Sequence, residues 1–347
     1  MKIAVTGLNN VDNPGPGVPV IRGIRDSKME NLKIIGLIYD VLDPGAYMPE
    51  VADKNYLIPY PSGGIDALFE RIKFINENEN IDVIIPTLDA ELYAFAKLEP
   101  KLNSIGIKTF LPDAEQLNIR SKDKLFKFCE DNNILAPKNI LASNFNDLYK
   151  IPTSFNYPVV IKGIFYDAYV VNNFDEAVSA FHKISNKWGL PIIVQQFLRG
   201  EEYNVTALGD GTGKTVGAVP MKKMSITDKG KGWAGVTIDE QEIINISKNI
   251  IEKLEWKGGA EFEFIKEAET GKFYLLEINP RFPAWVYLAV GAGQNLPFAN
   301  VQLALGNDVE TFEKYDVGKI FIRYSWDLIT DIKQFENMTV KGELSHE

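Results

Sequence analysis

Two short apolar segments on either side of residue 270 restrict the fold of this chain more than any other feature of its sequence. The segments AEFEFIKE and FYLLEINP alternate side chains as extended backbone does, and a turn at 269–271 separates them. The pattern predicts a pair of antiparallel strands, with Glu261 and Glu263 on one face of the first and Glu277 and Asn279 on one face of the second. If the two faces coincide, four oxygen-bearing side chains converge.

The donor chemistry of this predicted strand pair favours a metal site. Carboxylate and amide oxygens are the protein ligands that Mg²⁺ takes, and substrate phosphates usually complete its shell. Glu263, Glu277 and Asn279 are therefore predicted metal ligands, while the spacing leaves open whether Glu261 joins them. Arg281 follows directly, and its planar guanidinium matches a phosphate or a carboxylate. A solvated strand face with incidental charges is the alternative.

Histidine chemistry is excluded as the basis of catalysis. The chain has two histidines, His182 and His346, one in a predicted helix and one in the tail. No histidine-based triad or zinc site can be assembled from them. Carboxylates, lysines and backbone groups remain, and these suit phosphoryl transfer, in which positioning and electrostatics provide most of the catalysis.

The charge balance favours a small-molecule partner. Lys and Arg number 37 against 47 Asp and Glu, which gives a formal net charge of -10. A chain this acidic lacks the broad basic surface that binds nucleic acid or anionic lipid, so we expect neither a nucleic-acid nor a membrane partner.

A reducing, cytoplasmic location is the expectation from the rest of the composition. The N-terminal segment MKIAVTGLNN has no long apolar core or cleavage site of the secretory type. No later segment reaches the roughly 18 apolar residues that a membrane helix needs. The single cysteine, Cys129, lies in a helix-like run and is expected to be a structural thiol.

Strand-like and helix-like patterns alternate through the first third of the chain. The order KIAVTG, KIIGLIY, IDALFERIKFINENE and DVIIPT is typical of parallel strands joined by crossover helices. The sequence therefore predicts an open parallel α/β domain at 1–112, a small lid-like subdomain at 113–188, a larger mixed subdomain at 189–310 and a C-terminal extension at 311–347.

Two familiar phosphate-binding motifs fail on inspection. The run Gly209–Thr215 resembles a phosphate-binding loop, but Leu208 occupies the position where that motif requires glycine. We predict a hairpin turn there instead. The loop after the first strand, GLNNVDNPGPG, does not place its glycines in the GxGxxG register of dinucleotide-binding folds.

The segment LLEINPR, with Glu263 fourteen residues before Glu277, resembles the metal-binding strands of ATP-grasp enzymes. The likeness is greatest to the branch that contains carbamoyl-phosphate synthases and carboxylate-amine ligases. It implies an α/β N-terminal domain followed by an ATP-grasp fold, α+β in character, whose two subdomains clamp ATP. ATP and Mg²⁺ are the implied cofactors, with Mn²⁺ as a second candidate metal.

Further segments resemble successive stations of that family in the same order. SKDKLFKFCEDNN resembles the entry to the lid, which nominates Lys124 for the ATP phosphates. YPVVIKG resembles the lid strand, which nominates Lys162 for the same phosphates and for catalysis. VQQFLRGEEYNV resembles the hinge strand, and the residues it places beside adenine and ribose are Gln196, Phe197, Leu198 and Glu202.

The chain departs from the family pattern in two places. The loop after Lys162 is short, and Phe165, Tyr166 and Asp167 stand where many relatives have glycines. Either Tyr166 or the separate glycine-rich run at 228–236 is then expected to cover the phosphates. Gln196 also replaces the acidic hinge residue that is usual in the carbamoyl-phosphate synthase branch.

The resemblance implies an ATP-dependent ligase that forms an amide through an acyl phosphate, with Arg281 holding the carboxylate or the acyl phosphate. The expected partners are a carboxylate and an amine, with an amino acid or peptide preferred, and a homodimer is the default assembly. Arg22 and Arg25 are further candidates for a substrate carboxylate, with helix-start and surface roles as the alternatives. Two other functions remain open: phosphorylation of bicarbonate in a carbamoyl-phosphate synthase-like or carboxylase reaction, and a catalytically silent nucleotide-binding regulatory module.

Overall fold

A computed structural model describes residues 1–11, 14–121, 124–164, 167–227 and 230–346. The chain divides into two compact units, neither of which is continuous in sequence. Unit 1 contains residues 1–117, 204–261 and 279–347, and unit 2 contains residues 118–203 and 262–278. The predicted subdomain boundaries follow the chain in order, whereas the units are built from interleaved segments. In the part of the chain that is described, no helix has the length and apolar character needed to cross a membrane.

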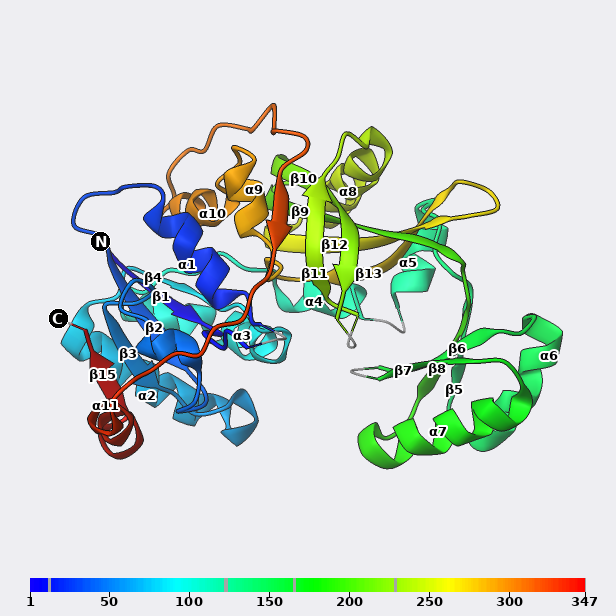
Figure 1. The fold of residues 1–347 in the computed structure, drawn as a ribbon, viewed down its shortest axis with the longest axis horizontal. Helices are drawn as coiled ribbons and strands as arrows, with labels where there is room; N and C mark the ends of the chain where they lie inside the picture. Colours follow the sequence, from blue (N-terminus) through cyan, green and yellow to red (C-terminus); the bar gives the residue numbers. More distant parts are fainter. Residues whose placement is uncertain (12–13, 122–123, 165–166, 228–229, 347) are drawn as a thin grey trace. The chain divides into compact units, whose positions relative to one another are not determined.

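The N-terminal part of unit 1 is an α/β layer built on a five-stranded sheet of order β15-β3-β2-β1-β4. Strands β1 to β4 pair in parallel, and β15, from the other end of the chain, pairs antiparallel with β3 (Figure 1). The strands are β1 (Lys2–Thr6), β2 (Lys33–Ile38), β3 (Lys54–Leu57), β4 (Val83–Ile85) and β15 (Glu343–Ser345). The predicted open parallel domain is confirmed, because these almost wholly apolar strands are covered on both faces.

Helices pack against both faces of this sheet. They are α1 (Gly17–Arg25), η1 (Pro44–Tyr47), η2 (Pro61–Gly63), α2 (Ile65–Glu79), α3 (Asp89–Ser104) and α4 (Ala114–Ile119). Arg22 and Arg25 lie in the last turn of α1.

A buried carboxylate ties α2 to the strands beside it. Glu79, 8% exposed, accepts hydrogen bonds from the Tyr56 hydroxyl at 2.6 Å and the Lys2 ammonium at 3.1 Å, and it pairs with Lys54 at 3.0 Å. Burial opposes its ionisation, but the hydrogen bonds from Tyr56, Lys54 and Lys2 outweigh that effect and lower the pKa of Glu79 to about 2.

This arrangement predicts an acid-sensitive contribution to stability. A depressed carboxyl pKa stabilises the fold fully above the ordinary value of 4.5, and the contribution is lost as the pH falls toward 2. We expect Glu79→Gln to lower the free energy of unfolding by about 2 kcal/mol at neutral pH. The difference between variant and wild type should shrink in denaturant titrations repeated from pH 6 to pH 3. A difference that stays constant over this range would show that Glu79 acts through packing alone.

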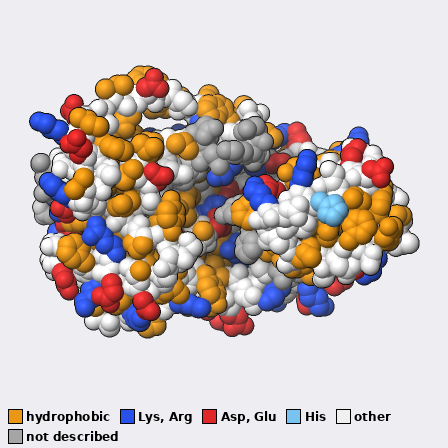
Figure 2. All heavy atoms as spheres, turned by 90° about the horizontal axis from the view of Figure 1, so that it is seen from below, with side chains coloured by type: hydrophobic (Ala, Val, Ile, Leu, Met, Phe, Trp, Pro, Cys, Tyr) orange, Lys and Arg blue, Asp and Glu red, His pale blue; other side chains and the backbone are white. Residues whose placement is uncertain are grey.

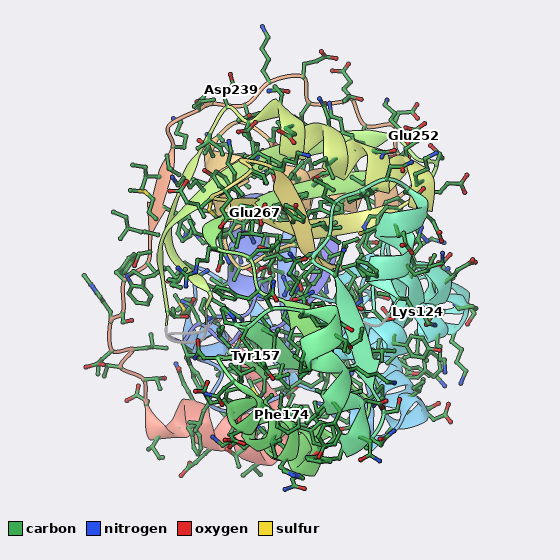
Figure 3. The ribbon with its side chains drawn as sticks, turned by 90° about the vertical axis from the view of Figure 1, so that its right-hand side faces the viewer. Lys124, Tyr157, Phe174, Asp239, Glu252 and Glu267 are labelled. Carbon is green, nitrogen blue, oxygen red and sulfur yellow. The ribbon has the colours of Figure 1, made fainter. Side chains whose placement is uncertain are left out.

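Unit 2 contains a four-stranded antiparallel sheet of order β5-β8-β6-β7 with helices against it. Its elements are α5 (Leu125–Asp131), β5 (Asn139–Ala142), η3 (Phe145–Lys150), α6 (Ile151–Ser154), β6 (Val159–Gly163), β7 (Ala168–Val171), α7 (Phe174–Trp188) and β8 (Ile192–Gln196). Asn173 caps α7 by accepting from the Glu176 backbone N–H, and the helix buries Ala177, Phe181 and Ile184 against the sheet. Figure 3 labels Phe174 at the start of this helix.

The third sheet has six strands in the order β13-β12-β9-β10-β11-β14. The strands are β9 (Gly200–Asp210), β10 (Thr215–Ile226), β11 (Gly232–Thr237), β12 (Lys257–Glu267), β13 (Phe273–Asn279) and β14 (Ile320–Ile322). The division between the units falls within β9, β12 and β13. The run from Gly209 is the predicted hairpin, in which Gly211 adopts a φ of 83° and Asp210 Oδ1 accepts from the Thr212 backbone N–H.

The remaining helices of unit 1 are α8 (Gln241–Leu254), α9 (Tyr287–Gly291), α10 (Leu296–Ala304), α11 (Ile332–Glu336) and the π-helix η4 (Asn337–Lys341). The C-terminal run FIRYSWDLI forms a strand only at Ile320–Ile322, and residues 323–331 have no regular secondary structure. The last residues then return to the N-terminal sheet as β15, where Leu344 joins its core.

Candidate functional site

One buried carboxylate, in the middle of β12, organises the polar side chains around it in unit 1. Glu261 is 6% exposed, and four side chains donate hydrogen bonds to it. Its Oε1 accepts from Asn204 Nδ2 and from Trp285 Nε1, each at 2.7 Å. Its Oε2 accepts from Asn279 Nδ2 at 3.0 Å and from Arg281 Nη1 at 3.2 Å. We call these five residues the Glu261 cluster.

The cluster gives Glu261 a role that strand spacing could not show. A carboxylate offers about four lone-pair positions, and four donors engage them here. Glu261 therefore orients the four side chains around it. Because Asn279 donates to Glu261 through its amide nitrogen, the opposite, oxygen end of the amide is the end that can act as a ligand.

A second contact holds Arg281 from the other side. Its Nε donates to Asp89 Oδ2 at 2.9 Å, at the first residue of α3. Glu91, in the same first turn of α3, is buried and accepts from the backbone N–H groups of Thr87 and Leu88, which fixes the start of the helix. Arg281 is thus held between two carboxylates on rigid elements.

Two further cations lie within electrostatic reach of these carboxylates. Neither was named as a site residue from the sequence, although Lys231 belongs to the glycine-rich run at 228–236. Lys231 is exposed at the surface, yet desolvation beside the cluster lowers its pKa. The charges of Arg281 and Arg323 lower the pKa further, and those of Glu261 and Asp89 oppose them. Desolvation also lowers the pKa of Arg323, against the charge of Glu261.

The backbone of Arg323 donates to the Trp233 carbonyl at 3.0 Å, next to the β11–β14 pairing. Within the described residues its Nε is buried without a hydrogen-bond partner. In the sequence, residues 320–323 show only a strand-like pattern. Their pairing with β11 could not be predicted from that pattern, because the two strands are separated by about a quarter of the chain.

The predicted metal ligands are divided between the two units. Glu263 on β12 and Glu277 on β13 belong to unit 2, and both are partly buried. Asn279, two residues after Glu277 on the same strand, belongs to unit 1 and is buried. No group of three His, Cys, Asp or Glu side chains among the described residues is arranged to hold a metal ion. Two carboxylates and an oriented amide still supply the hard oxygen donors that Mg²⁺ accepts, so the residue types fit the ion.

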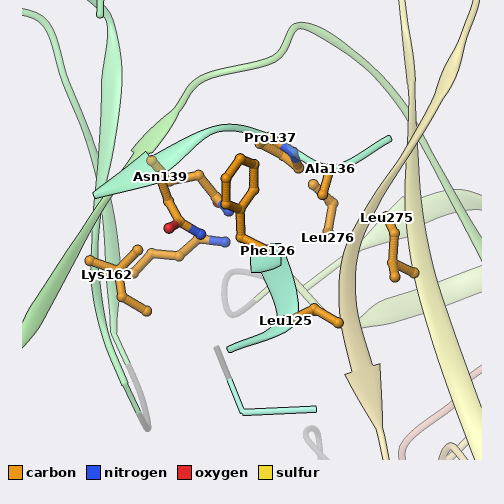
Figure 4. A pocket seen from close by; sticks show the side chains of 10 residues that line it. Leu125, Phe126, Ala136, Pro137, Asn139, Lys162, Leu275 and Leu276 are labelled. Carbon is orange, nitrogen blue, oxygen red and sulfur yellow. The ribbon is translucent and has the colours of Figure 1, made fainter. Parts of the chain in front are cut away.

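Unit 2 contains a recess between α5, its antiparallel sheet and β13. The lining combines apolar side chains with a few polar ones, and its members are Leu125, Phe126, Ala136, Pro137, Asn139, Lys162, Ile193, Gln195, Leu275 and Leu276. Figure 4 shows Lys162 reaching from β6 toward the ring of Phe126. Lys162, which the sequence nominated, thus lines the recess. On strand β8 the residue that lines it is Gln195, and not the nominated Gln196.

The other predicted hinge residues follow Gln195, a residue of the recess, in the sequence. Gln196 exchanges hydrogen bonds with Lys138, donating its backbone N–H at 2.8 Å and accepting from the Lys138 N–H at 3.3 Å. Leu198 is buried, and Phe197 and Glu202 are partly buried.

The residues nominated to cover the phosphates are only partly described. Lys124 precedes α5, is exposed, and donates to Asn118 Oδ1 at 2.6 Å; Figure 3 labels it. Phe165 and Tyr166, and residues 228 and 229 of the glycine-rich run, lie outside the described residues.

The candidate arginines of the N-terminal domain have other partners. Arg25 pairs with Asp53 at 3.1 Å and donates to the Val51 carbonyl at 2.9 Å. Arg22 stacks over the ring of Tyr287, with its guanidinium carbon 3.8 Å from the ring centroid.

Known proteins share both segments and architecture with this chain. Residues 190–321 match a family described as "ATP-grasp in the biosynthetic pathway with Ter operon". The carbamoyl phosphate synthase large chain of Thermotoga petrophila is 23% identical over 293 residues, which cover 78% of this chain and 26% of that protein. The chain thus spans about a quarter of the length of this relative.

Two solved structures share most of the fold. One is the biotin carboxylase domain dimer of the Hydrogenobacter thermophilus 2-oxoglutarate carboxylase, in complex with MgADP, ADP and bicarbonate. It has a TM-score of 0.71 and 16% identity, and covers 92% of this chain and 73% of its own. The other is an L-amino acid ligase from Bacillus licheniformis, with a TM-score of 0.67 and 16% identity. The match covers 89% of this chain and 75% of the ligase chain. These findings confirm the resemblance expected from the sequence: the chain has the ATP-grasp fold, and its sequence is similar to the carbamoyl phosphate synthase branch of that superfamily.

Proposed function

We propose that the protein is an ATP-dependent carboxylate-amine ligase. A substrate carboxylate attacks the γ-phosphate of ATP, the bond to the β-phosphate oxygen breaks, and an acyl phosphate and ADP form. An amine then attacks the acyl carbon and releases inorganic phosphate and a proton, which leaves an amide. The observation that carries this proposal is Arg281, held by Glu261 and Asp89 and accompanied by Lys231 and Arg323.

The charges around Arg281 suit an anionic substrate. Three cations, Lys231, Arg281 and Arg323, share this part of unit 1 with two carboxylates, Glu261 and Asp89. Three cations against two carboxylates leave a surplus of one positive charge. A guanidinium fork binds a carboxylate or an acyl phosphate through two parallel hydrogen bonds, which favours one orientation of the substrate.

The recess in unit 2 supports the binding of ATP. Its apolar walls, including Phe126 and Leu275, suit a purine ring, while Lys162 offers a cation for the phosphates. Gln196, Phe197, Leu198 and Glu202 continue from the same edge of the sheet and are our candidates for the adenine edge and ribose. Lys124 and Lys162 would offset the negative charge that spreads over the γ-phosphate oxygens.

Mg²⁺ is the proposed metal, with Glu263, Glu277 and Asn279 as its ligands. The ion would neutralise charge on the phosphate oxygens of ATP. This proposal rests on the donor types and on the orientation that Glu261 imposes on Asn279.

Bicarbonate is the second candidate for the acid. The cations around Arg281 would accept a small oxyanion as readily as a larger carboxylate, and a structural neighbour was solved with bicarbonate. The presence of the nominated metal ligands Glu263, Glu277 and Asn279 together with Lys124 and Lys162 argues against a silent regulatory module.

The test is nucleotide turnover in the presence of defined acids and amines. Purified protein with Mg²⁺ and ATP would be incubated with pools of amino acids, peptides and small carboxylates, and separately with bicarbonate, and ADP and phosphate release would be followed. Release that needs one carboxylate and one amine, with an amide found by mass spectrometry, supports the ligase. Release with bicarbonate alone supports the second candidate. ATP binding without release in any pool would contradict both.

The cations around Arg281 predict a substrate-binding role for Arg323. We expect Arg323→Gln to raise the KM for the carboxylate by about 10- to 100-fold, because a charge-assisted hydrogen bond to the anion is lost. The kcat and the KM for ATP should change little. Lys319→Gln is the matched control, since Lys319 is an exposed cation four residues earlier that pairs with Asp316. Equal effects of the two substitutions would contradict a specific role for Arg323.

A further inference from the structure

Asp167 closes the connection that leads from Lys162 on β6 to the neighbouring strand β7. The two strands pair antiparallel, with Lys162 opposite Ala168. The Gly163 backbone N–H donates to the Asp167 carbonyl at 3.0 Å. Asp167 thus stands at the start of β7, and Lys162, at the other side of the connection, lines the recess proposed for ATP (Figure 4).

The backbone of Asp167 has a conformation that glycine adopts most readily. Its φ is 66°, in the left-handed region. Hairpin connections often place glycine at this position, immediately before the returning strand. An aspartate costs conformational free energy there, so we expect its side chain to make contacts that offset this cost.

The Asp167 side chain joins the connection to the end of α7. Its Oδ2 accepts from Trp188 Nε1 at 2.7 Å and from Lys187 Nζ at 3.0 Å. Trp188 is the last residue of α7, and Lys187 Nζ lies 4.9 Å from the centroid of the Trp188 ring. The hydrogen bonds from Trp188 and Lys187 lower the pKa of Asp167, so its carboxylate is charged at neutral pH. We call these three residues the Asp167 anchor.

The Asp167 anchor differs from an ordinary surface ion pair. Acidic and basic side chains are interspersed over the face that Figure 2 shows, and isolated exposed pairs contribute little to stability. Asp167 instead accepts two donors on one oxygen, and one of them belongs to a planar indole ring. The helix behind these donors is fixed, because it buries Ala177, Phe181 and Ile184. The connection is therefore held by a packed helix.

We propose that Asp167 is a positioning residue for the nucleotide. By holding the connection against α7, it fixes the end of β6 from which Lys162 reaches toward the phosphates of ATP. Lysine is a point charge on a flexible stem, so the place where its strand ends determines which phosphate oxygens it meets. Asp167 acts through Lys162 and not on the nucleotide itself. This inference rests on the proposed ATP-dependent function.

The affinity of the full chain for MgATP, measured by isothermal titration calorimetry without a carboxylate substrate, tests this role. Asp167→Gly keeps a residue that accepts the left-handed backbone but removes the anchor. We expect its dissociation constant for MgATP to rise about 10-fold, as for the loss of a charge-assisted hydrogen bond. Asp167→Asn keeps an oxygen for the Trp188 indole and tolerates the same φ, so its affinity should stay within about 3-fold of the wild type.

Turnover assays separate positioning from a general loss of structure. In Asp167→Gly the KM for ATP should rise by a factor similar to that of the dissociation constant, while kcat at saturating ATP changes little. Lys150→Gln is the matched control, since it removes another surface ion pair of unit 2, with Asp147 at 2.7 Å, outside the connection. Its affinity for MgATP should equal that of the wild type.

The inference and the proposed function fail on different results. If the wild type binds no MgATP, the proposed function is wrong and this inference falls with it. If the wild type binds MgATP and Asp167→Gly binds it equally well, the inference alone is overturned. It is also overturned if Asp167→Asn is as weak as Asp167→Gly, or if Lys150→Gln loses as much affinity. In either case the loss would not depend on the oxygen that Asp167 offers to Trp188.

Discussion

Replacing Glu277 by glutamine is expected to reduce ADP release by about 10³-fold or more, the largest effect on activity that the structure predicts. Glutamine keeps the shape of the side chain but removes the charge that the proposed Mg²⁺ ligand supplies. The concentration of Mg²⁺ needed for half-maximal activity should therefore rise as kcat falls.

The metal dependence separates a ligand from a structural residue at position 277. Glu269→Gln is the matched control, because Glu269 is an exposed carboxylate on the turn that joins the same two strands. Its turnover and Mg²⁺ requirement should equal those of the wild type. If Glu277→Gln lost activity with an unchanged Mg²⁺ requirement and a lowered melting temperature, a structural role would replace the proposed one.

Replacing Arg281 by lysine is expected to lower kcat/KM for the carboxylate by about 10²- to 10³-fold while ATP still binds with its normal affinity. Lysine keeps the positive charge and so continues to compensate Glu261 and Asp89. It lacks the planar fork that contacts both carboxylates at 3.2 and 2.9 Å and is proposed to present further N–H groups to the substrate.

Trp285→Phe is the control for this second prediction. It removes one neutral donor to Glu261, at 2.7 Å, and leaves the charges and most of the packing in place. We expect it to reduce stability by about 1–2 kcal/mol, as for a lost buried hydrogen bond, with a much smaller kinetic effect than Arg281→Lys. Thermal unfolding and steady-state kinetics on both variants provide the comparison. A kinetic loss in Trp285→Phe as large as that in Arg281→Lys would mean that the order of the cluster, rather than the guanidinium, determines activity.

Local patterns were enough to predict the α/β layer and the strand pair around residue 270. The strands β1, β2 and β4 are continuous apolar runs, and the periods of 2 and 3.6 residues that separate strand from helix are visible within a dozen residues. The hairpin at Asp210 follows for the same reason, because its turn chemistry is local. Arg281 was nominated from the residues that end an apolar strand, and Lys162 from the resemblance of YPVVIKG to a lid strand, and each motif lies within a single segment.

Only the tertiary structure decided what Glu261 does. Strand alternation placed it on the same face as Glu263 and left it a candidate metal ligand, whereas its donors come from β9, from β13 and from the residues between β13 and α9. Lys231 and Arg323 reach the same region from segments about 90 residues apart, and β15 completes the N-terminal sheet from the far end of the chain. Contacts between distant segments depend on the free energy of the whole packed fold, and neither side-chain period nor local propensity contains that information.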